Sequence, residues 1–367
     1  MFVLGSRDFR LPGLGSYLQT AANAGDTRAI LWGVMTMIGV IVLIDQVVWR
    51  PVIAWAEKFK LEQVGAAEVP RSPILTLLRS SKLLPFVTRS FVLPIRERLD
   101  LRFAKAQEAA SLTKGTRPAR QWILHAAGVV VLAAASCAVV KLFATLATIS
   151  AAELRHLVWG AAATFLRVEA VLLLAALWTI PVGVIVGLRP KLSAIAQPIA
   201  QIAASVPATA LFPIILLVLS RAGGGLGIGS IVLLLLGTQW YLLFNVIAGA
   251  TAIPADLKEV CSTYQLSRTE RWRTLFLPAI FPYLITGFVT ASGGAWNASI
   301  VAEYFHFRGQ TISTIGLGAI ISQATDSGNL RLLLAATVVM AIMVVTINRL
   351  VWRPLYALAS TRFKLEG

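Results

Sequence analysis

The chain has few of the residues from which enzymes build active sites. Its 367 residues include 3 histidines, 2 cysteines and 17 acidic residues, and charged residues make up 14% of the total, against about a quarter in soluble domains. His125, His156 and His306 are scattered and form neither an HExxH motif nor a triad. The glycine-rich, lysine-containing loop that binds ATP phosphates is also missing. We therefore predict no catalytic residues, no metal site, no cofactor and no ATP hydrolysis by this chain.

Acidic residues are outnumbered by 33 basic residues, which gives a net charge of +16. Such an excess is compatible with nucleic-acid binding, but 57% of the residues are hydrophobic and the mean hydropathy is +0.76. Basic residues that border apolar runs are what the positive-inside rule produces. We therefore predict a membrane protein that contacts lipid and binds no nucleic acid. No disulfide is expected, because Cys137 lies in an apolar run and Cys261 in a segment assigned to the reducing cytosol.

Seven apolar runs are long enough for a helix that crosses a bilayer, which needs about 20 residues. They lie at about 29–49, 122–146, 159–187, 192–220, 228–250, 279–302 and 330–352. Lysine and arginine cluster at 50–60, 71–120, 189–191, 258–273 and 349–364. If every cluster faces the cytoplasm, the N-terminus lies outside and the C-terminus inside. The predicted fold class is all-α, a polytopic membrane protein with about seven transmembrane helices.

The two ends of the chain resemble each other. Four features recur at both ends with the same spacing. The first set is Gly13-Leu-Gly15, Gly25, Arg28 and Val48-Trp-Arg-Pro51, and the second is Gly316-Leu-Gly318, Gly328, Arg331 and Val351-Trp-Arg-Pro354. We therefore predict three parts: 1–62, the truncated end of a first unit with one transmembrane helix; 63–120, a basic cytoplasmic linker; and 121–367, a complete unit with about six transmembrane helices. The linker either carries amphipathic helices on the membrane surface or is a solvated connector.

A charged segment, residues 254–278, lies between two of the apolar runs. Each of its charged side chains would cost about 2.5 to 3.5 kcal/mol at the centre of a membrane. They are Asp256, Lys258, Glu259, Arg268, Glu270, Arg271 and Arg273. The segment must therefore lie in water, and we interpret it as a short helix or helical pair on the cytoplasmic face, to which a soluble partner docks.

The order of residues in this segment resembles a known motif. Glu259-Val-Cys-Ser-Thr-Tyr-Gln265, followed by Phe276-Leu-Pro278, is similar to the EAA loop of ATP-binding-cassette (ABC) importer permeases. That loop has Glu-Ala-Ala, three residues, a glycine and, further on, a hydrophobic residue, leucine and proline. The surrounding sequence resembles the nitrate, sulfonate, bicarbonate and taurine branch of the family, in the stretches Ile253-Pro-Ala-Asp-Leu-Lys258, Pro282-Tyr-Leu-Ile-Thr-Gly287, Ala295-Trp296 and Val301-Ala-Glu303. The resemblance covers about residues 158–355.

The resemblance implies the type I ABC importer permease fold in a bacterial inner membrane. It also implies three partners: a dimer of ABC ATPase subunits, an extracytoplasmic substrate-binding protein, and a second permease unit in a homo- or heterodimer. In the family this loop is a coupling helix that fits a cleft on the ATPase. The residues that carry over to that role are Glu259, Val260, Cys261, Gln265, Leu266, Arg268, Arg271, Trp272 and Pro278. Because Gln265 stands in place of the family's glycine, we expect a less sharp turn, and Val260 and Cys261 in place of alanines predict a bulkier docking helix.

Polar residues and prolines inside the apolar runs are candidates for a translocation path. Ionisable residues inside a membrane span are energetically costly and are functional candidates by default. Arg167 and Glu169 are two such residues, and they cannot pair with each other, because residues two apart on a helix face nearly opposite ways. An interfacial position near the outer end is the alternative for both. Pro207 either lines a path or kinks a packed helix. Trp296, Asn297 and Glu303 either line the path or form hydrogen bonds between helices. The path candidates are Arg167, Pro207, Trp296, Asn297 and Glu303.

The predicted function is that of a permease subunit in an ATP-driven importer, with ATP hydrolysed by a partner chain. The family branch points to a small anion such as nitrate, a sulfonate or bicarbonate. The alternative is a secondary transporter driven by an ion gradient. That class carries carboxylates and broken helices at the bilayer midplane, whereas the acidic residues here cluster in loops and near the ends of the spans. This distribution favours the importer.

Overall fold

A computed structural model describes residues 2–4, 7–9, 12–49, 51, 52, 93, 96, 97, 100–104, 118–221, 225–307 and 310–363. Apart from two short β hairpins, the described chain is helical, so the all-α prediction is confirmed. The chain forms two compact units, residues 1–41 with 146–367, and residues 42–145. Most of helix α7 (Pro118–Leu146) belongs to the second unit. The surface helices predicted for 63–120 lie largely outside the described residues.

Six helical stretches in the described part are long and apolar enough to cross a membrane, or seven if one bent pair counts as a span. Three consist of single helices: Ala127–Leu146 within α7, α8 (Ala151–Gly187) and α11 (Leu226–Thr251). The bent pair is α9 (Pro190–Ser205) with α10 (Ala208–Arg221). Together with three interrupted helices these stretches account for all seven predicted spans.

The three interrupted helices each contain a π-helical segment. They are α2 (Thr27–Ile44) with η1 (Asp45–Trp49), α13 (Arg268–Arg271) with η4 (Trp272–Phe276) and α14 (Leu277–Ala302), and α16 (Leu330–Ile347) with η5 (Asn348–Trp352) and α17 (Arg353–Arg362). Each segment ends two residues before a proline: Pro51, Pro278 or Pro354. Proline has no N–H to donate and its ring crowds the carbonyl of the preceding turn. A widened turn accommodates the ring, so α14 and α17 continue from η4 and η5 through Pro278 and Pro354.

The predicted span 192–220 is broken rather than continuous. α9 and α10 meet at an angle of 74°, and the break falls at Val206 and Pro207. Pro207 lacks the N–H that would continue the helical ladder, and its carbonyl instead accepts the amide of Ala210, at 2.9 Å, in the first turn of α10. The proline therefore ends one helix and starts the next.

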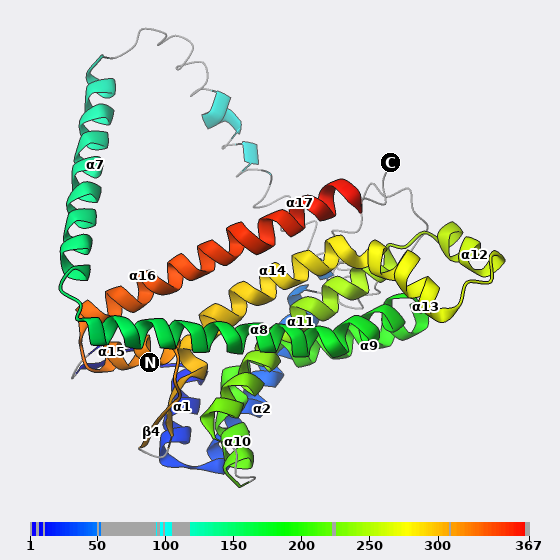
Figure 1. Ribbon diagram of the computed structural model, residues 1–367, viewed down its shortest axis with the longest axis horizontal. Helices are drawn as coiled ribbons and strands as arrows, with labels where there is room; N and C mark the ends of the chain where they lie inside the picture. The colour runs from blue at the N-terminus through cyan, green and yellow to red at the C-terminus, as the bar shows by residue number, and fades with distance from the viewer. Residues whose placement is uncertain are drawn as a thin grey trace. The chain divides into compact units, whose positions relative to one another are not determined.

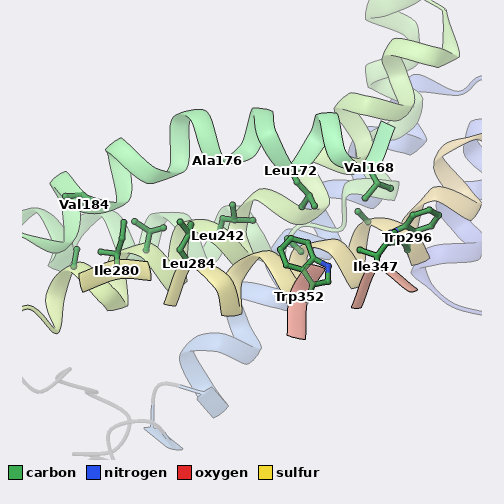
Figure 2. Packing of buried hydrophobic residues seen from close by; sticks show 14 residues of the cluster. Val168, Leu172, Ala176, Val184, Leu242, Ile280, Leu284, Trp296, Ile347 and Trp352 are labelled. Atoms are coloured by element: carbon green, nitrogen blue, oxygen red, sulfur yellow. The ribbon is translucent and has the colours of Figure 1, made fainter. Parts of the chain in front are cut away.

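Helices α8, α11 and α14 form the centre of the larger unit and pack side by side (Figure 1). Their buried side chains form one cluster, to which α16 and η5 add Ile347 and Trp352 (Figure 2). Glycines allow close approach at these contacts: a Cβ on Gly183 of α8 would lie 2.7 Å from a methyl of Val246 in α11. Interiors are packed at crystal-like density, so these helices form a rigid block on which the functional segments are mounted.

The internal repeat is also a structural repeat. α1 (Leu14–Ala24) and α2 correspond to α15 (Leu317–Asp326) and α16 with a constant shift of 303 residues, as from Leu14 to Leu317. Gly25 and Gly328 both have φ of 68°, which glycine adopts without cost. The amides of Asp26 and Asn329 bond the carbonyls of Ala21 and Ala324, at 3.0 and 2.9 Å, and so close the same turn.

The repeat extends further than the sequence comparison indicated. β1 (Phe2–Leu4) and β2 (Arg7–Phe9) form an antiparallel hairpin, as do β3 (Tyr304–Phe307) and β4 (Gln310–Ser313). The register is the same after the shift of 303 residues, since Phe2 pairs with Phe9 and Phe305 with Ile312. Each copy therefore consists of a hairpin, a short helix, a long helix and a π-helical segment.

Candidate coupling loop and membrane face

The charged segment folds as the predicted helical pair. α12 (Ala255–Thr263) follows Pro254, and α13 begins after Ser267. Ser267 and Glu270 form a capping box: the Ser267 amide donates to Glu270 Oε2 at 2.8 Å, and the Glu270 amide donates to Ser267 Oγ at 3.4 Å. Two amides at the helix start are satisfied in this way. From Arg268 the helix runs to Ala302, 35 residues in all, so the loop is joined directly to a membrane span.

The turn after α12 is sharp, in contrast to the expectation from Gln265. Gln265 has φ of 50° and is the only non-glycine residue with positive φ in the described chain. The amide of Leu266 donates to the carbonyl of Cys261 at 3.1 Å, and the amide of Gln265 to that of Ser262 at 3.0 Å. This pair of bonds defines a Schellman motif, in which glycine usually takes the left-handed position. The turn keeps its geometry and Gln265 carries the strain.

One side of the loop is anchored to the protein body. Cys261 is buried among Ile253, Leu275 and Ala279. Trp272 is half-buried against the central cluster, with its ring 5.7 Å from that of Phe276 in an edge-on arrangement. Contacts within the loop involve three more of the predicted residues. Arg271 Nε donates to the carbonyl of Leu266 at 2.9 Å, and Pro278 lies in the first turn of α14. These predicted coupling residues help to hold the loop in place, and apart from the buried Cys261 they are half-buried.

Beside the buried Cys261, α12 presents an exposed apolar stripe. Leu257, Val260 and Tyr264 follow one another at spacings of three and four residues, so they lie on one face of the helix. All three are exposed, and Tyr264 is 76% exposed. Glu259, on another side of α12, and Arg268, in α13, are also exposed. The prediction named Val260, Glu259 and Arg268 but missed Leu257 and Tyr264, although their helical spacing was visible in the sequence.

Arg167 and Glu303, which were predicted separately, form a buried ion pair. Arg167 Nη1 of α8 contacts Glu303 Oε1 at the end of α14. Thr164, one turn earlier on α8, donates its hydroxyl to Glu303 at 2.8 Å. Arg167 Nη2 also donates to the carbonyl of Ile315 at 3.1 Å. Glu169 is half-buried and takes no part in these contacts, as predicted from its place on the helix.

The same carboxylate caps the short helix α15. The amides of Gly318 and Ala319 donate to Glu303 Oε2 at 2.8 and 3.2 Å, and the amide of Leu317 donates to the Thr164 hydroxyl at 2.8 Å. A negative charge at a helix N-terminus also interacts favourably with the helix dipole. Glu303 therefore joins α8, α14 and α15. All its contacts are internal, which assigns Arg167 and Glu303 a structural role.

The close fit around Glu303 depends on two glycines. A Cβ on Gly316 would lie 2.1 Å from Glu303 Oε2, and a Cβ on Gly318 would lie 2.4 Å from the Ser299 carbonyl oxygen. Atoms at such distances overlap, so another residue at 316 would displace the Glu303 carboxylate, and another residue at 318 would require movement of the backbone. The Gly316-Leu-Gly318 motif thus has a direct steric cause.

The exposed face of α14 combines a stripe of polar and small residues with two valines, Val289 and Val301. Thr286, Thr290, Gly293 and Asn297 follow at spacings of four, three and four residues and are all exposed. On the neighbouring helix α11, Tyr241 is exposed and Asn245 half-buried beside this stripe, since Gly287 approaches both residues closely. Trp296, next to Asn297, instead points into the core and is buried (Figure 2). Of this predicted pair, only Asn297 lies on the open face.

The open face of α8 has the opposite character. It carries large aliphatic side chains, among them Leu166, Leu173 and Leu177. In membranes, helix–helix contacts are enriched in small and polar residues, whereas lipid tails are as apolar as leucine. The contrast assigns the α8 face to lipid, and the α11–α14 face to protein or water. Pro207, at the break of the bent span, is also exposed.

A polar cluster lies beside the β3–β4 hairpin. Tyr304 donates its hydroxyl to Asp326 Oδ2 at 2.7 Å, and His306 Nε2 lies 2.8 Å from the same oxygen. Burial, together with the adjacent carboxylate, raises the pKa of Tyr304 to about 12. Among the described residues no three His, Cys, Asp or Glu side chains are placed to hold a metal ion.

Residues 179–358 match the family model for the binding-protein-dependent transport system inner membrane component. The chain is 28% identical to the nitrate import permease protein NrtB of Leptolyngbya laminosa, over 53% of this chain and 66% of that protein. It is 30% identical to the bicarbonate transport system permease protein CmpB of Synechococcus elongatus, over 41% of this chain and 52% of the relative. It is 27% identical to the taurine transport system permease protein TauC of Escherichia coli, over 49% and 62%.

Among solved structures, the inward-facing MetNI methionine ABC transporter aligns with a TM-score of 0.48 and 22% identity, over 57% of this chain and 99% of that chain. The chain spans about half to two thirds of the length of the curated relatives it matches. These relatives are named as permease proteins, in agreement with the prediction of a transport subunit. The predicted resemblance is confirmed: residues 179–358 match the model of binding-protein-dependent transport inner membrane components, and the relatives are permeases for nitrate, bicarbonate and taurine.

Proposed function

We propose that this chain is the membrane subunit of an ATP-driven importer and couples to a separate ATPase dimer through α12. The proposal rests on the exposed apolar stripe of Leu257, Val260 and Tyr264. The stripe lies in segment 254–278, whose charged side chains place it in water. An apolar stripe on a solvated helix is a typical docking surface for a protein groove. α12 is fixed to the body by Cys261 and by the Schellman turn, so a force applied to the stripe moves the long helix α13–η4–α14.

The translocation path in this proposal runs along the α11–α14 face. Hydroxyl, carboxamide and phenol groups from Thr286, Thr290, Asn297 and Tyr241 provide hydrogen-bonding partners along one side. The face carries no carboxylate, which would repel an anion. Together with the named substrates of the relatives, nitrate, bicarbonate and taurine, this favours a small anion delivered by an extracytoplasmic binding protein. A second permease unit supplies the other side of the path.

The proposed orientation has the N-terminus outside and the C-terminus in the cytoplasm, which places α12 on the side of the ATPase. An ion-driven mechanism has less support. The most deeply buried carboxylate, Glu303, is engaged by Arg167, Thr164 and two amides, so it is not free to bind and release an ion.

Substitution of the stripe tests the proposal. Leu257→Glu or Tyr264→Ala should reduce co-purification of the ATPase and uptake of labelled nitrate, bicarbonate or taurine by about tenfold or more, because central apolar anchors dominate interfaces. Membrane insertion should be unchanged, since both side chains lie in water. Thr269→Ala, at an exposed position on α13, is the matched control and should behave as the unmodified chain. Full uptake by both stripe variants would refute the coupling role of α12.

A further inference from the structure

The two copies of the repeat contact each other reciprocally. β1 of the first copy lies beside α15 of the second, and α1 of the first lies beside β3 of the second. Since β1 corresponds to β3 and α1 to α15, exchanging the copies converts one contact into the other. Contacts of this kind, in which i meets j and j meets i, are characteristic of twofold-related units. The first copy therefore stands where the closing module of a twofold-related unit would stand.

The second copy is fixed to its own body by specific contacts. Glu303 caps α15, and Arg331 Nη2 pairs with Glu153 Oε1 at 2.7 Å, while its Nη1 donates to the Thr148 carbonyl at 3.1 Å. Leu317 and Ile320 are buried against Leu157 of α8. These contacts define the surface through which the module attaches to a permease body.

The first copy retains the same polar and glycine residues without these contacts. Gly13 and Gly15 match Gly316 and Gly318, yet a Cβ at either position would meet nothing within 4 Å. Arg28 matches Arg331 and is exposed, with no side-chain partner in the described part of the chain. Nothing in the described surroundings requires glycine at 13 or 15 or arginine at 28. A body like that of residues 151–303 would require all three.

The apolar part of the attachment surface is also open in the first copy. Leu14, Tyr17 and Trp32 match Leu317, Ile320 and Ala335. The latter three are buried, Ala335 to 1% exposure, whereas Trp32 is 72% exposed and Leu14 and Tyr17 are also exposed. The opposite side of the module is already covered, since Leu18, Ile30 and Val34 cluster with Ala210 of α10 (Figure 1). The module thus has one face on this unit and one free face.

We propose that the free face of α1–α2, formed by Gly13, Gly15, Tyr17, Arg28 and Trp32, is the docking surface for the body of a second permease unit. The occupant is a body with helices equivalent to α8 and α14, which carries one carboxylate at the position of Glu153 and a second at the position of Glu303. The contact of α1–α2 with α10 is then the unit-to-unit interface. This inference rests on the proposed function and adds the surface by which the second unit is held.

Photo-cross-linking in native membranes tests the inference. A photoreactive phenylalanine analogue at Trp32 or Tyr17 of the full chain should form an adduct with a second permease, which mass spectrometry would map to the helix equivalent to α8. The analogue at Leu173, on the aliphatic face of α8, should give no protein adduct. Arg28→Glu should lower the Trp32 adduct about fivefold, the effect of an exposed ion pair, whereas Arg155→Glu, also exposed, should leave it unchanged.

Two outcomes would overturn the inference: lipid adducts only from Trp32 and Tyr17, or adducts that map to the ATPase or to a binding protein. The analogue at Tyr264, in the same membranes, reports ATPase docking independently. An ATPase adduct from Tyr264 without a permease adduct from Trp32 would refute the docking surface and leave the proposed function intact.

Discussion

At the scale of single residues, Gln265 shows how backbone geometry can be kept while the usual residue is absent. Its φ of 50° lies in the left-handed region, where a side chain costs about 1 to 2 kcal/mol. The two Schellman hydrogen bonds and the burial of Cys261 hold the turn in place. Position 265 is therefore a point of stored strain at the end of the helix that we assign to coupling.

Replacing Gln265 with glycine should relieve this strain. We expect thermal unfolding of the detergent-purified protein to show a net gain of about 0.5 to 1 kcal/mol, since glycine also gains freedom in the unfolded chain. Thr263→Gly, within α12, is the control and should cost about as much. A loss of stability in Gln265→Gly would mean that the turn is not left-handed at 265.

Sequence reasoning identified the helical segment that we propose for coupling but not the direction of its side chains. Glu259, Val260 and Arg268 are exposed as a docking role requires, whereas Cys261 and Trp272 face inward. The family motif identifies positions along the chain but not which side of α12 faces the protein body. That rotation of the helix decides which residues are exposed to a partner and which anchor the loop. Leu257 and Tyr264 could have been found by extending that phase from Val260.

At the scale of elements, α15 is attached through one carboxylate and two closely packed glycines in addition to its buried apolar side chains. Gly318→Ala would place a methyl group 2.4 Å from the Ser299 carbonyl and should cost more than 2 kcal/mol, as overpacking does. Gly293→Ala is the matched control on α14, because a Cβ there meets nothing within 4 Å and alanine favours the helix. Thermal unfolding should separate the two variants, and equal stabilities would argue against the observed docking of α15.

The elements themselves were largely predictable. Apolar length gave the spans, and the repeated glycines gave the correspondence of α1–α2 with α15–α16. The β hairpins were missed because three or four residues give too short a pattern to recognise. The bend between α9 and α10 was missed because Pro207 alone does not distinguish a kink from a break. At Pro278 and Pro354, after η4 and η5, the helix stays continuous.

At the scale of the whole molecule, three surfaces of the larger unit differ in chemistry. The α8 face is aliphatic, the α11–α14 face is small and polar, and the α12 stripe is apolar but lies in a charged segment. Each matches a different environment: lipid, a wet path beside a second unit, and a soluble partner. This division supports the proposal of a subunit that joins a membrane path to an external ATPase.

Cross-linking from α12 in the assembled transporter is the most direct test of this account. A photoreactive residue at Tyr264 or Leu257 should form an adduct with the co-expressed ATPase, while the same residue at Trp272, which packs inward, should form none. If Trp272 gives the ATPase adduct and Tyr264 and Leu257 do not, the stripe is not the docking surface, and the central claim is contradicted.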